Sequence, residues 1–482
     1  MKPTKPLSAQ FVLRISRLNR LSHLGHLALF FILACASTLN AQNRTVLLIS
    51  VDGMKPEYVT KADEHGLKIP NMRRMMQEGA YAEGVIGVVP TVTYASHTTL
   101  ITGVWPEKHG IYANTTFDPE RKNLGGWYWY AEDIKVPTLW DAAKAAGWTT
   151  AAVNWPVTVG APVNYLLPEI WRTGTADDLK LLRAVSTPGL MAKLESTLGA
   201  YPEPINSSPE NDRMRTKFAI AILQQYKPKL MAVHLAALDH AEHETGPFST
   251  ESNAVMEQID EMIGQLRDTA RAIDPQTVIC VVSDHGFLPT SHRLNLTSAF
   301  VKAGLMEPGT ETNSAGAIPL KSWQATTWIS GGLAAIMLKD PNDEAVAGKV
   351  RALLNQLKDD PRSGINRIVE RDELKKLGGF PNASFLVDLK SGYQLDTSLN
   401  GEIFRDTKAN GTHGYLPEHP ELHSSFFIAG AGIAKGRMLG VIDMRQIAPT
   451  LAGLFGGSLP TADGKPLAVT VQDGAARAKE TK

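Results

Sequence analysis

Short apolar runs that end in polar residues recur along the N-terminal part of the chain. The runs that fit buried strands are Val46–Val51, Thr149–Asn154, Leu230–Ala237 and Val278–Ser283. Between the last two, apolar residues recur at helical spacing. These positions are Val255, Ile259, Met262, Ile263, Leu266, Ala270 and Ile273. A helix that joins two buried strands is a βαβ crossover, so we expect an α/β fold with a mostly parallel central sheet covered by helices on both faces.

The pattern changes in the second half of the chain. Residues 309–319 are rich in Gly, Pro, Ser and Thr, and an amphipathic helix with Val346, Val350 and Leu357 follows, flanked by the β-like pieces Leu333–Leu338 and Ser384–Leu389. We therefore predict an inserted cap subdomain over residues 293–405. The catalytic core would comprise residues 42–292 and 406–475, with a polar tail over 476–482.

The pattern of the N-terminus is typical of an export signal. Basic residues precede the apolar run Leu27–Ala36, which is shorter than the roughly 20 residues needed to span a bilayer. We predict a signal peptide over residues 1–41 and a periplasmic or secreted protein. Ile32–Cys35 loosely matches a lipobox, so a lipid anchor at Cys35 is the alternative. The only other cysteine is Cys280, which leaves no internal disulfide after cleavage.

Composition narrows the choice of partner. The chain has 482 residues, 43% of them hydrophobic, with 49 basic and 49 acidic side chains. This balance fits a globular protein and gives no sign of a nucleic-acid-binding surface. It also gives no sign of the oligomeric state.

Aspartates and histidines cluster where the predicted strands end. The set is Asp52, Asp239, His243, Asp284, His285 and His413. Carboxyl ends of parallel strands share one edge of the sheet, where ligands bind in such folds. Asp239 and His243 are spaced i, i+4, so a helix would place both on one face. Three Asp and three His without Cys suit two zinc ions, or another divalent metal.

Thr93 is the candidate nucleophile. The segment Pro90–Gly103 fits a loop that enters a helix, and a hydroxyl at that junction faces free backbone N–H groups and the positive end of the helix dipole. Metal coordination would activate this alcohol. Thr91, two residues earlier, is the competing candidate. Asn114, downstream, could donate a hydrogen bond to a phosphate oxygen.

Taken together, these motifs resemble the nucleotide pyrophosphatase/phosphodiesterase family of the alkaline phosphatase superfamily. The resemblance covers residues 45–290 and 411–467 and depends on five segments in the family's order. They are Ser50–Met54, Thr93–Gly103 with Pro106–Gly110 and Asn114, Asp239–Gly246, Ser283–Gly286 and His413–Tyr415.

The resemblance implies a role for each residue. Asp239, His243 and His413 would bind the zinc that holds the attacking water. Asp52, Asp284, His285 and the Thr93 oxygen would bind the zinc that activates the nucleophile. Asn114 and the backbone N–H of Thr93 or Tyr94 would hold the phosphoryl oxygen, in an alkaline-phosphatase-like fold that forms a covalent phosphothreonine.

The substrate pocket is less well defined. The family's aromatic-Pro-Asn-His after the nucleophile is here Tyr94-Ala95-Ser96-His97, which puts substrate preference in doubt. Tyr94 and Trp155 are candidate pocket residues. The aromatic run Trp127–Tyr130 would either line the pocket with Tyr94 or pack between helix and loop.

Several of these residues could instead have a purely structural role. Asp52 alone could be a helix N-cap, and His97 and His109 could shape the nucleophile helix and its turn. The histidines expected to be ordinary core or surface groups are His65, His234, His240, His292, His419 and His423. The predicted function is a two-zinc phosphodiesterase. The alternatives are a phosphomonoesterase, a phosphonate hydrolase, or an exported ligand-binding protein with an inactive metal site.

Overall fold

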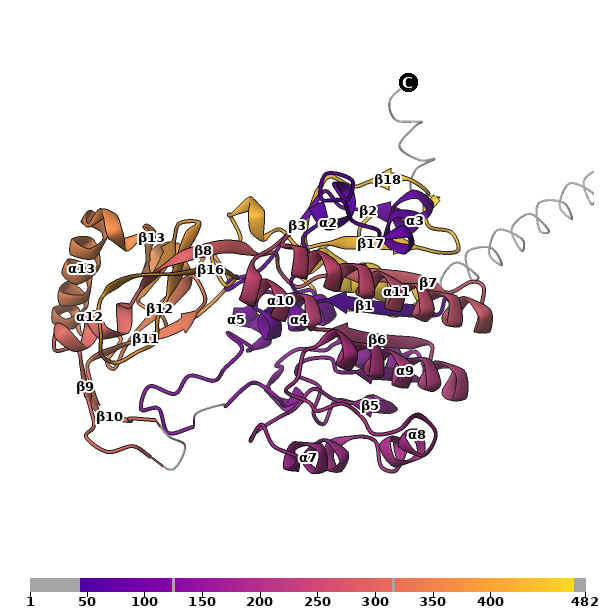
Figure 1. Ribbon diagram of the computed structural model, residues 1–482, viewed down its shortest axis with the longest axis horizontal. Helices are drawn as coiled ribbons and strands as arrows, with labels where there is room; N and C mark the ends of the chain where they lie inside the picture. Colours follow the sequence, from indigo (N-terminus) through magenta and orange to yellow (C-terminus); the bar gives the residue numbers. More distant parts are fainter. Residues whose placement is uncertain (1–43, 124–125, 314–316, 472–482) are drawn as a thin grey trace, which may run out of the picture.

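The computed structural model describes residues 44–123, 126–313 and 317–471 (Figure 1). An eight-stranded sheet forms the core, in the order β18-β2-β17-β7-β1-β6-β4-β5. In that order the strands are β18 (Arg437–Met438), β2 (Ala80–Tyr81), β17 (Phe426–Ala429), β7 (Val278–Val282), β1 (Val46–Val51), β6 (Leu230–Leu235), β4 (Thr150–Val153) and β5 (Tyr165–Leu167). Strands β7, β1, β6, β4 and β5 are parallel, and β17 pairs antiparallel with β7. The predicted mostly parallel α/β sheet is confirmed.

Helices cover both faces of this sheet because alternate residues of each buried strand point to opposite sides. Leu47, Ile49 and Val51 face one layer and Val46 and Leu48 the other. The first layer contains α3 (Pro70–Glu78), α7 (Asp177–Val185), α8 (Leu190–Leu198), α9 (Pro209–Tyr226) and α11 (Thr250–Ile273). The second contains α4 (Thr93–Thr102), α6 (Leu139–Ala145) and α15 (Ile447–Leu454).

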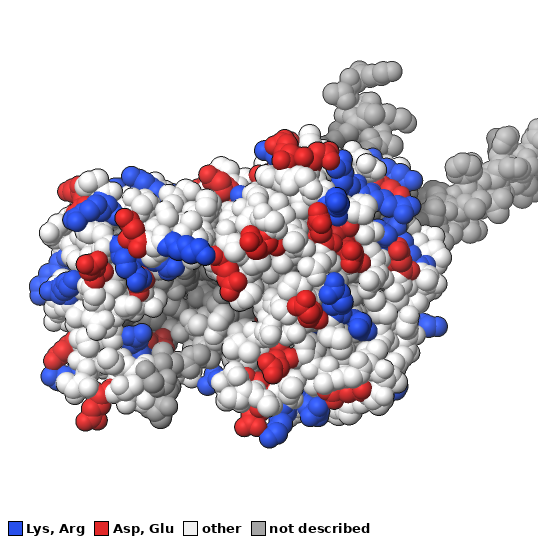
Figure 2. Space-filling model, viewed as in Figure 1, with Lys and Arg blue, Asp and Glu red and all other residues white. Residues whose placement is uncertain are grey.

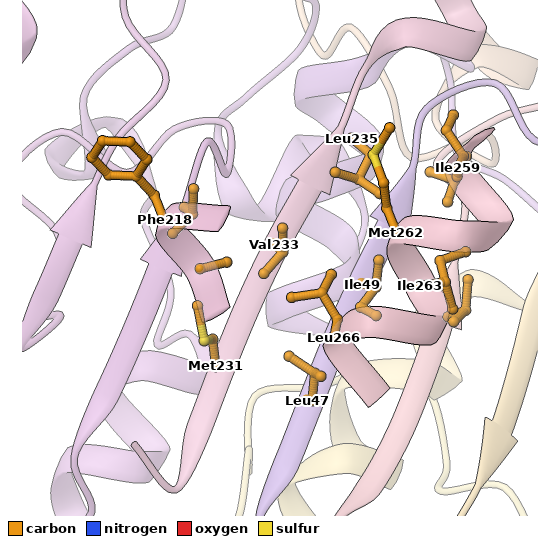
Figure 3. Close-up of a cluster of buried hydrophobic side chains, with 14 of the residues drawn as sticks. Leu47, Ile49, Phe218, Met231, Val233, Leu235, Ile259, Met262, Ile263 and Leu266 are labelled. Carbon is orange, nitrogen blue, oxygen red and sulfur yellow. The ribbon is translucent and has the colours of Figure 1, made fainter. Parts of the chain in front are cut away.

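Helix α11 is the predicted crossover helix between β6 and β7. Its residues Ile259, Met262, Ile263 and Leu266 are fully or almost fully buried and pack in the cluster that contains Ile49 (Figure 3). Burial of such side chains stabilises the fold by about 1.5–3 kcal/mol each. The strand predicted over Leu230–Ala237 stops at Leu235, because α10 (Ala237–Thr245) begins directly after it.

A three-stranded ribbon connects the core to a second lobe. Strand β8 (Leu288–Leu294) leads out and β16 (Phe404–Thr412) leads back, with β15 (Gly392–Leu395) on the other side of β8. Arg293 pairs with Arg405 across this ribbon, so the two predicted cap boundaries lie opposite each other.

The second lobe is a four-stranded antiparallel sheet with helices on one face. The sheet consists of β11 (Ala325–Ser330), β12 (Leu333–Leu338), β14 (Phe385–Leu389) and β13 (Ile365–Glu370). The predicted amphipathic helix is α13 (Glu344–Asp359), which packs on this sheet with α12 (Leu296–Lys302). The other face packs against core residues that include Val89, Ala113 and Leu416.

The remaining elements are short. The helices are α2 (Glu57–Thr60), α5 (Pro106–His109) and α14 (Arg371–Leu374), and the strands are β3 (Gly84–Ile86), β9 (Met306–Pro308), β10 (Leu320–Trp323) and β19 (Val441–Asp443). In the described part of the chain, no helix combines the length and apolar character needed to cross a membrane. The predicted signal peptide and Cys35 lie outside the described residues.

Candidate active site

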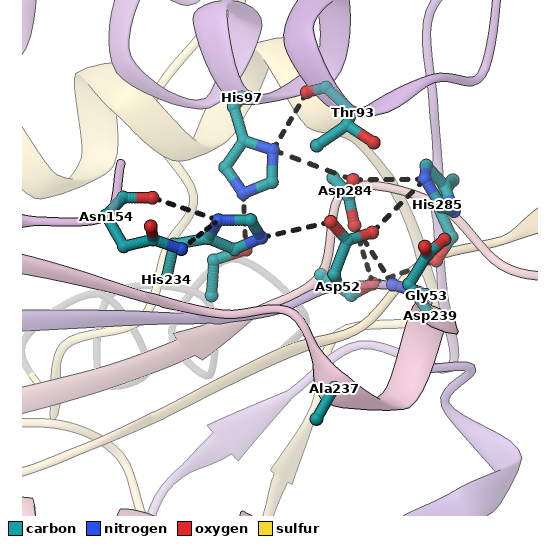
Figure 4. Close-up of polar contacts among 12 residues, drawn as sticks. Asp52, Gly53, Thr93, His97, Asn154, His234, Ala237, Asp239, Asp284 and His285 are labelled. Carbon is teal, nitrogen blue, oxygen red and sulfur yellow. Dashed lines mark hydrogen bonds and ion pairs between the residues drawn. The ribbon is translucent and has the colours of Figure 1, made fainter. Parts of the chain in front are cut away.

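The predicted ligands come together at one edge of the central sheet, and Figure 4 shows Asp52, Asp239, Asp284 and His285 among them. Asp52 follows β1 directly, and Asp284 and His285 follow β7. Asp239 and His243 lie on α10, which begins just after β6. Strands β7, β1 and β6 are neighbours in the sheet. Their carboxyl ends therefore bring together side chains from three distant parts of the sequence.

His413 reaches the same edge from the end of β16. Its ring stacks on that of His285, with centroids 3.6 Å apart. Its Nε2 lies 3.5 Å from Oδ1 of Asp239, and the Nε2 of His243 lies 3.5 Å from the same oxygen. Asp239, His243 and His413 thus form one group of ligand atoms that all lie within 4.8 Å of one another.

A second group forms around His285. Its Nε2 is 3.3 Å from Oδ1 of Asp52 and 3.1 Å from Oδ2 of Asp284. Asp52, Asp239 and His285 offer ligand atoms within 4.8 Å of one another. Asp239 therefore belongs to both groups and lies between them.

Several of these ligand atoms are buried without a hydrogen-bond partner. They are Oδ1 of Asp52, Oδ1 of Asp239, Oδ2 of Asp284 and Nε2 of His285. Burial, and then the negative charges of Asp284 and Asp239, raise the pKa of Asp52 well above its usual value. Burial also raises the pKa of Asp239 to about 6. Unpartnered buried carboxylates are costly, and divalent cations would satisfy them. The donor set of carboxylates and imidazoles fits zinc.

Backbone carbonyls orient the three imidazoles. Nδ1 of His413 is 3.0 Å from the backbone oxygen of Thr91, and Nδ1 of His243 is 3.2 Å from that of Gly411. Nδ1 of His285 is 3.2 Å from the backbone oxygen of Gly286. A carbonyl can only accept, so each Nδ1 carries the hydrogen and each Nε2 is left with a lone pair for a metal.

Thr93 is the first residue of α4 and is 8% exposed. His97, one turn later, connects it to the ligands: its Nδ1 is 2.8 Å from the backbone oxygen of Thr93 and 3.6 Å from Oδ2 of Asp284 (Figure 4). The expectation that His97 shapes the nucleophile helix agrees with this contact. Thr93 thus lies where the free N–H groups of a helix start meet the acidic cluster.

Thr91, the competing nucleophile, is fully buried. Its hydroxyl donates to the backbone oxygen of Tyr415 at 3.1 Å and accepts from the Tyr415 N–H at 3.0 Å. With both bonds made to backbone, this hydroxyl serves the loop that carries His413.

Asn114 lies against the start of α4. Its Oδ1 accepts the N–H of Tyr94 at 2.9 Å. The Tyr94 N–H is therefore occupied by the side chain that was expected to act beside it. The bond fixes the carbonyl end of the amide and leaves its Nδ2 as the hydrogen-bond donor.

The model of the type I phosphodiesterase / nucleotide pyrophosphatase family matches residues 46–416 of this chain. The chain belongs to this family. The match spans every predicted ligand and confirms the resemblance that the motifs indicated.

Curated members of the family are distantly related to this chain, and each match covers only part of both proteins. An uncharacterized pyrophosphatase/phosphodiesterase of Schizosaccharomyces pombe is 26% identical over 52% of this chain and 46% of its own length. Human ectonucleotide pyrophosphatase/phosphodiesterase family member 1 is 24% identical over 50% of this chain and 23% of its own length. Human bis(5'-adenosyl)-triphosphatase ENPP4 is 24% identical over 51% and 48%. The matched region thus spans half or less of these relatives.

Solved structures share the fold. Human ectonucleotide pyrophosphatase / phosphodiesterase 5 superposes with a TM-score of 0.61 at 20% identity, covering 88% of this chain and 97% of that one. An inactive variant of the murine protein in complex with AMP gives a TM-score of 0.62 at 20% identity, with coverages of 88% and 98%. The expected alkaline-phosphatase-like fold of the family is confirmed.

The candidate pocket aromatics lie in packed surroundings. Trp155 is fully buried, and its ring contacts that of His97 at 4.9 Å. In this structure its ring packs against α4 from the core and is not accessible to solvent. Tyr94 is 1% exposed and packs edge-on against Trp127 and Trp129, at 5.2 and 5.8 Å between centroids. Of these aromatics, Trp127 is the one that stays partly exposed.

The surface is hollowed between the cap and the core (Figure 2). A cavity of about 250 Å³ lies between the segment that follows Asn114 and strand β11 of the cap. Its lining includes Thr115, Phe117, Thr326 and Trp328. The residues that follow Asn114 in the sequence therefore form one wall of this cavity, and strand β11 of the cap forms the other.

Some supporting residues were not predicted. His234, expected to be an ordinary core or surface group, lies in β6 with its Nε2 3.0 Å from Oδ2 of Asp52 (Figure 4). Asp212 on α9 accepts the backbone N–H of Ala237 at 2.8 Å and pairs with Arg215 at 2.9 Å, all in the interior. This buried pair fixes the start of the helix that carries two ligands. Neither residue belongs to a motif, and only the paired strands and packed helices reveal them.

Proposed function

We propose that this protein is a two-zinc phosphodiesterase of the nucleotide pyrophosphatase type. The observation that carries the proposal is the pair of ligand groups with unpartnered buried oxygens beside the hydroxyl-bearing start of α4. Asp239, His243 and His413 would hold one ion. Asp52, Asp284, His285 and the Thr93 oxygen would hold the other.

Charge balance supports a diester substrate. When bound, the ions supply Lewis-acid charge that stabilises the pentavalent transition state and lowers the pKa of the groups they bind. Two divalent cations and the three ionised carboxylates leave about one net positive charge, before the Thr93 alkoxide is counted. A phosphodiester carries one negative charge, so the attraction is favourable without being excessive.

The proposed reaction consists of two successive displacements at phosphorus, and different residues act in each. The Thr93 oxygen attacks phosphorus in line and forms a covalent phosphothreonine, while the bond to the leaving alcohol or phosphate breaks. Water then attacks the same phosphorus from the opposite side and restores the hydroxyl, so configuration at phosphorus is retained. Asn114 would donate its Nδ2 hydrogens to a non-bridging oxygen whose negative charge grows in each transition state.

The substrate class follows from relatives only in outline. One similar structure is a complex with AMP, and a relative is a bis(5'-adenosyl)-triphosphatase. A nucleotide ester or dinucleotide polyphosphate is therefore the first substrate to test here. Because the names of the relatives describe ectoenzymes, we also expect this protein to act after export.

A hydrolysis panel with purified zinc-loaded protein tests the proposal. It should include an aryl phosphodiester, an aryl phosphomonoester, a phosphonate ester, a dinucleotide polyphosphate and a choline-phosphate ester. Diester and nucleotide substrates should turn over fastest. Preference for the monoester or the phosphonate would favour those hydrolases, and a metal-loaded protein that cleaves none would favour a binding protein.

A further inference from the structure

His234 is a buried histidine that the proposed chemistry leaves without a role. It lies in β6, directly opposite Ser50 of β1, and is 1% exposed. Its Nε2 is 3.0 Å from Oδ2 of Asp52. The other carboxylate oxygen, Oδ1, has no hydrogen-bond partner and lies 3.3 Å from Nε2 of His285. The two oxygens of Asp52 therefore have different surroundings.

The direction of the His234 hydrogen bond follows from the chemistry of its neighbours. An ionised Asp52 can only accept, so Nε2 of His234 carries the hydrogen. On the other side of the ring, Nδ1 lies 3.0 Å from the backbone oxygen of Asn154 and 3.4 Å from its side-chain nitrogen. When Nδ1 also carries a hydrogen, the backbone oxygen of Asn154 accepts it. When Nδ1 carries none, the side-chain N–H of Asn154 donates to it. Asn154 therefore holds the ring in place in either charge state.

Asp284 shows the same division between its two oxygens. Its Oδ1 accepts the backbone N–H of Gly53 at 3.2 Å, and its Oδ2 has no hydrogen-bond partner. In both carboxylates one oxygen is tied to a protein donor and the other is directed at the candidate metal. For Asp284 the donors are the Gly53 backbone and, at 3.4 Å, the Ser283 hydroxyl. For Asp52 it is the side chain of His234, which substitution can remove.

We infer that His234 is a positioning residue that holds Asp52 as a one-oxygen metal ligand by binding its second oxygen. The inference rests on the proposed function only in its assumption that metal binds at Asp52. Without the donor, the carboxylate is free to turn or to bind through both oxygens. Removing a partner of this kind from a metal ligand typically lowers metal affinity about 10–100-fold.

The test compares three variants of the full chain by zinc titration against a chromophoric chelator. His234→Phe keeps a ring and removes the donor. His234→Asn is smaller, is polar and is too short to reach Asp52. His234→Gln places an amide N–H near the original Nε2. We expect the first two to bind one of two zinc ions about 10–100-fold more weakly, and His234→Gln to bind both nearly as wild type does.

His109→Phe is the matched control. His109 is also fully buried, and its ring bonds to Thr99 and to the Ile111 N–H, with no contact to a candidate ligand. Its substitution should lower stability without changing zinc affinity. If His234→Phe and His234→Asn bind both ions with wild-type affinity, or if His234→Gln is as weak as they are, the inference is overturned.

The two proposals can fail separately. A wild-type protein that binds two zinc ions and cleaves no phosphoester would remove the proposed function, while the affinities of the variants would still decide the role of His234. A wild-type protein that binds no zinc would overturn both.

Discussion

Nδ1 of His413 lies 3.0 Å from the backbone oxygen of Thr91, and the Thr91 hydroxyl is bonded to both the N–H and the carbonyl of Tyr415. The loop before α4 therefore holds His413, the predicted ligand that comes last in the sequence. One buried threonine, two residues before the proposed nucleophile, connects the start of α4 to the end of β16.

Thr91→Val tests this connection between the loop before α4 and the end of β16. Valine has nearly the same shape but leaves the Tyr415 N–H without its partner and the Tyr415 carbonyl with only the longer bond from the Thr91 N–H, at 3.4 Å. We therefore expect a loss of about 1–3 kcal/mol in the free energy of unfolding. Zinc affinity should also fall at the group formed by Asp239, His243 and His413. Denaturant unfolding and zinc titration measure the two effects. Thr91→Ser, which keeps the hydroxyl, should lie close to wild type in both.

Thr93→Ala tests the nucleophile. Removing the hydroxyl should lower kcat on an aryl diester by a factor of at least about 10³, because the covalent step is lost. The other ligands remain, so two zinc ions should still bind. Thr93→Ser keeps an attacking hydroxyl and should retain measurable turnover with a trapped phosphoserine. Normal activity in Thr93→Ala would show that the nucleophile lies elsewhere.

The shared position of Asp239 predicts an asymmetry between ligand variants. The proposed assignment gives Asp239 to one ion, but its carboxylate also lies within 4.8 Å of ligand atoms of Asp52 and His285 at the other. Asp239→Asn should therefore weaken the binding of both zinc ions, whereas His243→Gln should weaken one, since His243 belongs to a single group. A tightly bound ion at about 100 times its Kd stabilises the fold by about 2.7 kcal/mol. Addition of a chelator should therefore lower the Tm most in wild type, less in His243→Gln and least in Asp239→Asn. Equal shifts in the two variants would contradict the sharing.

Gly331 connects the cap to the candidate metal site through a close contact with His413. It is left-handed, with φ +66°, and an added Cβ would lie 1.8 Å from the backbone oxygen of His413. The next residue, Gly332, donates its N–H to that same oxygen at 3.2 Å. We expect Gly331→Ala to displace His413 and to lower both zinc affinity and turnover.

Gly304→Ala is the control for Gly331→Ala. Gly304 has φ +71° with nothing within 4 Å of an added Cβ. Both variants should lose about 1 kcal/mol from the left-handed backbone, but only Gly331→Ala should alter the site. Wild-type turnover in Gly331→Ala would mean that the cap hairpin does not fix His413.

His419 gives the fold a pH-dependent contact between cap and core. Its Nε2 hydrogen-bonds to Asp388 of β14 at 2.8 Å, and this bond raises its pKa above the usual 6.5. A raised pKa means that the stabilisation is complete below 6.5 and is lost as pH rises through the folded value.

The free energy of unfolding lost in His419→Gln should accordingly be larger at about pH 5.5 than at about pH 9. Denaturant titrations at the two pH values measure this difference. His292→Gln is the matched control, because the ring of His292 also pairs with an aspartate, Asp406, but both side chains are exposed. That variant should change stability little at either pH.

The sequence predicted most of the ligand set because strand order dictates it. Asp52, Asp239 and Asp284 follow apolar runs, and parallel runs end at one edge, so their convergence needed no coordinates. His413 was reached through its motif alone, since nothing in the local pattern brings the end of β16 to that edge.

Other features depended on contacts that no local pattern records. His234 lies within a uniformly apolar strand, and only its register opposite Ser50 brings it to Asp52. Trp155 was predicted for the pocket from the family resemblance of its segment, but in the fold its ring is buried and packs edge-on against His97. The contact of Gly331 with His413 joins a turn in the cap to the core. A glycine in the sequence can indicate a turn, but it does not indicate which distant residue the turn will contact.

Strands β8 and β16 have a consequence for the order of events during biosynthesis. The chain leaves the core just after His285, builds the whole cap, and only then supplies His413. A nascent or truncated polypeptide that ends within the cap carries six of the seven proposed ligand side chains and lacks the imidazole of His413, which completes one ligand group. If the proposed site binds zinc, full metal loading would come late, after the ribbon has closed, and a prematurely terminated product would be released with one ligand group incomplete.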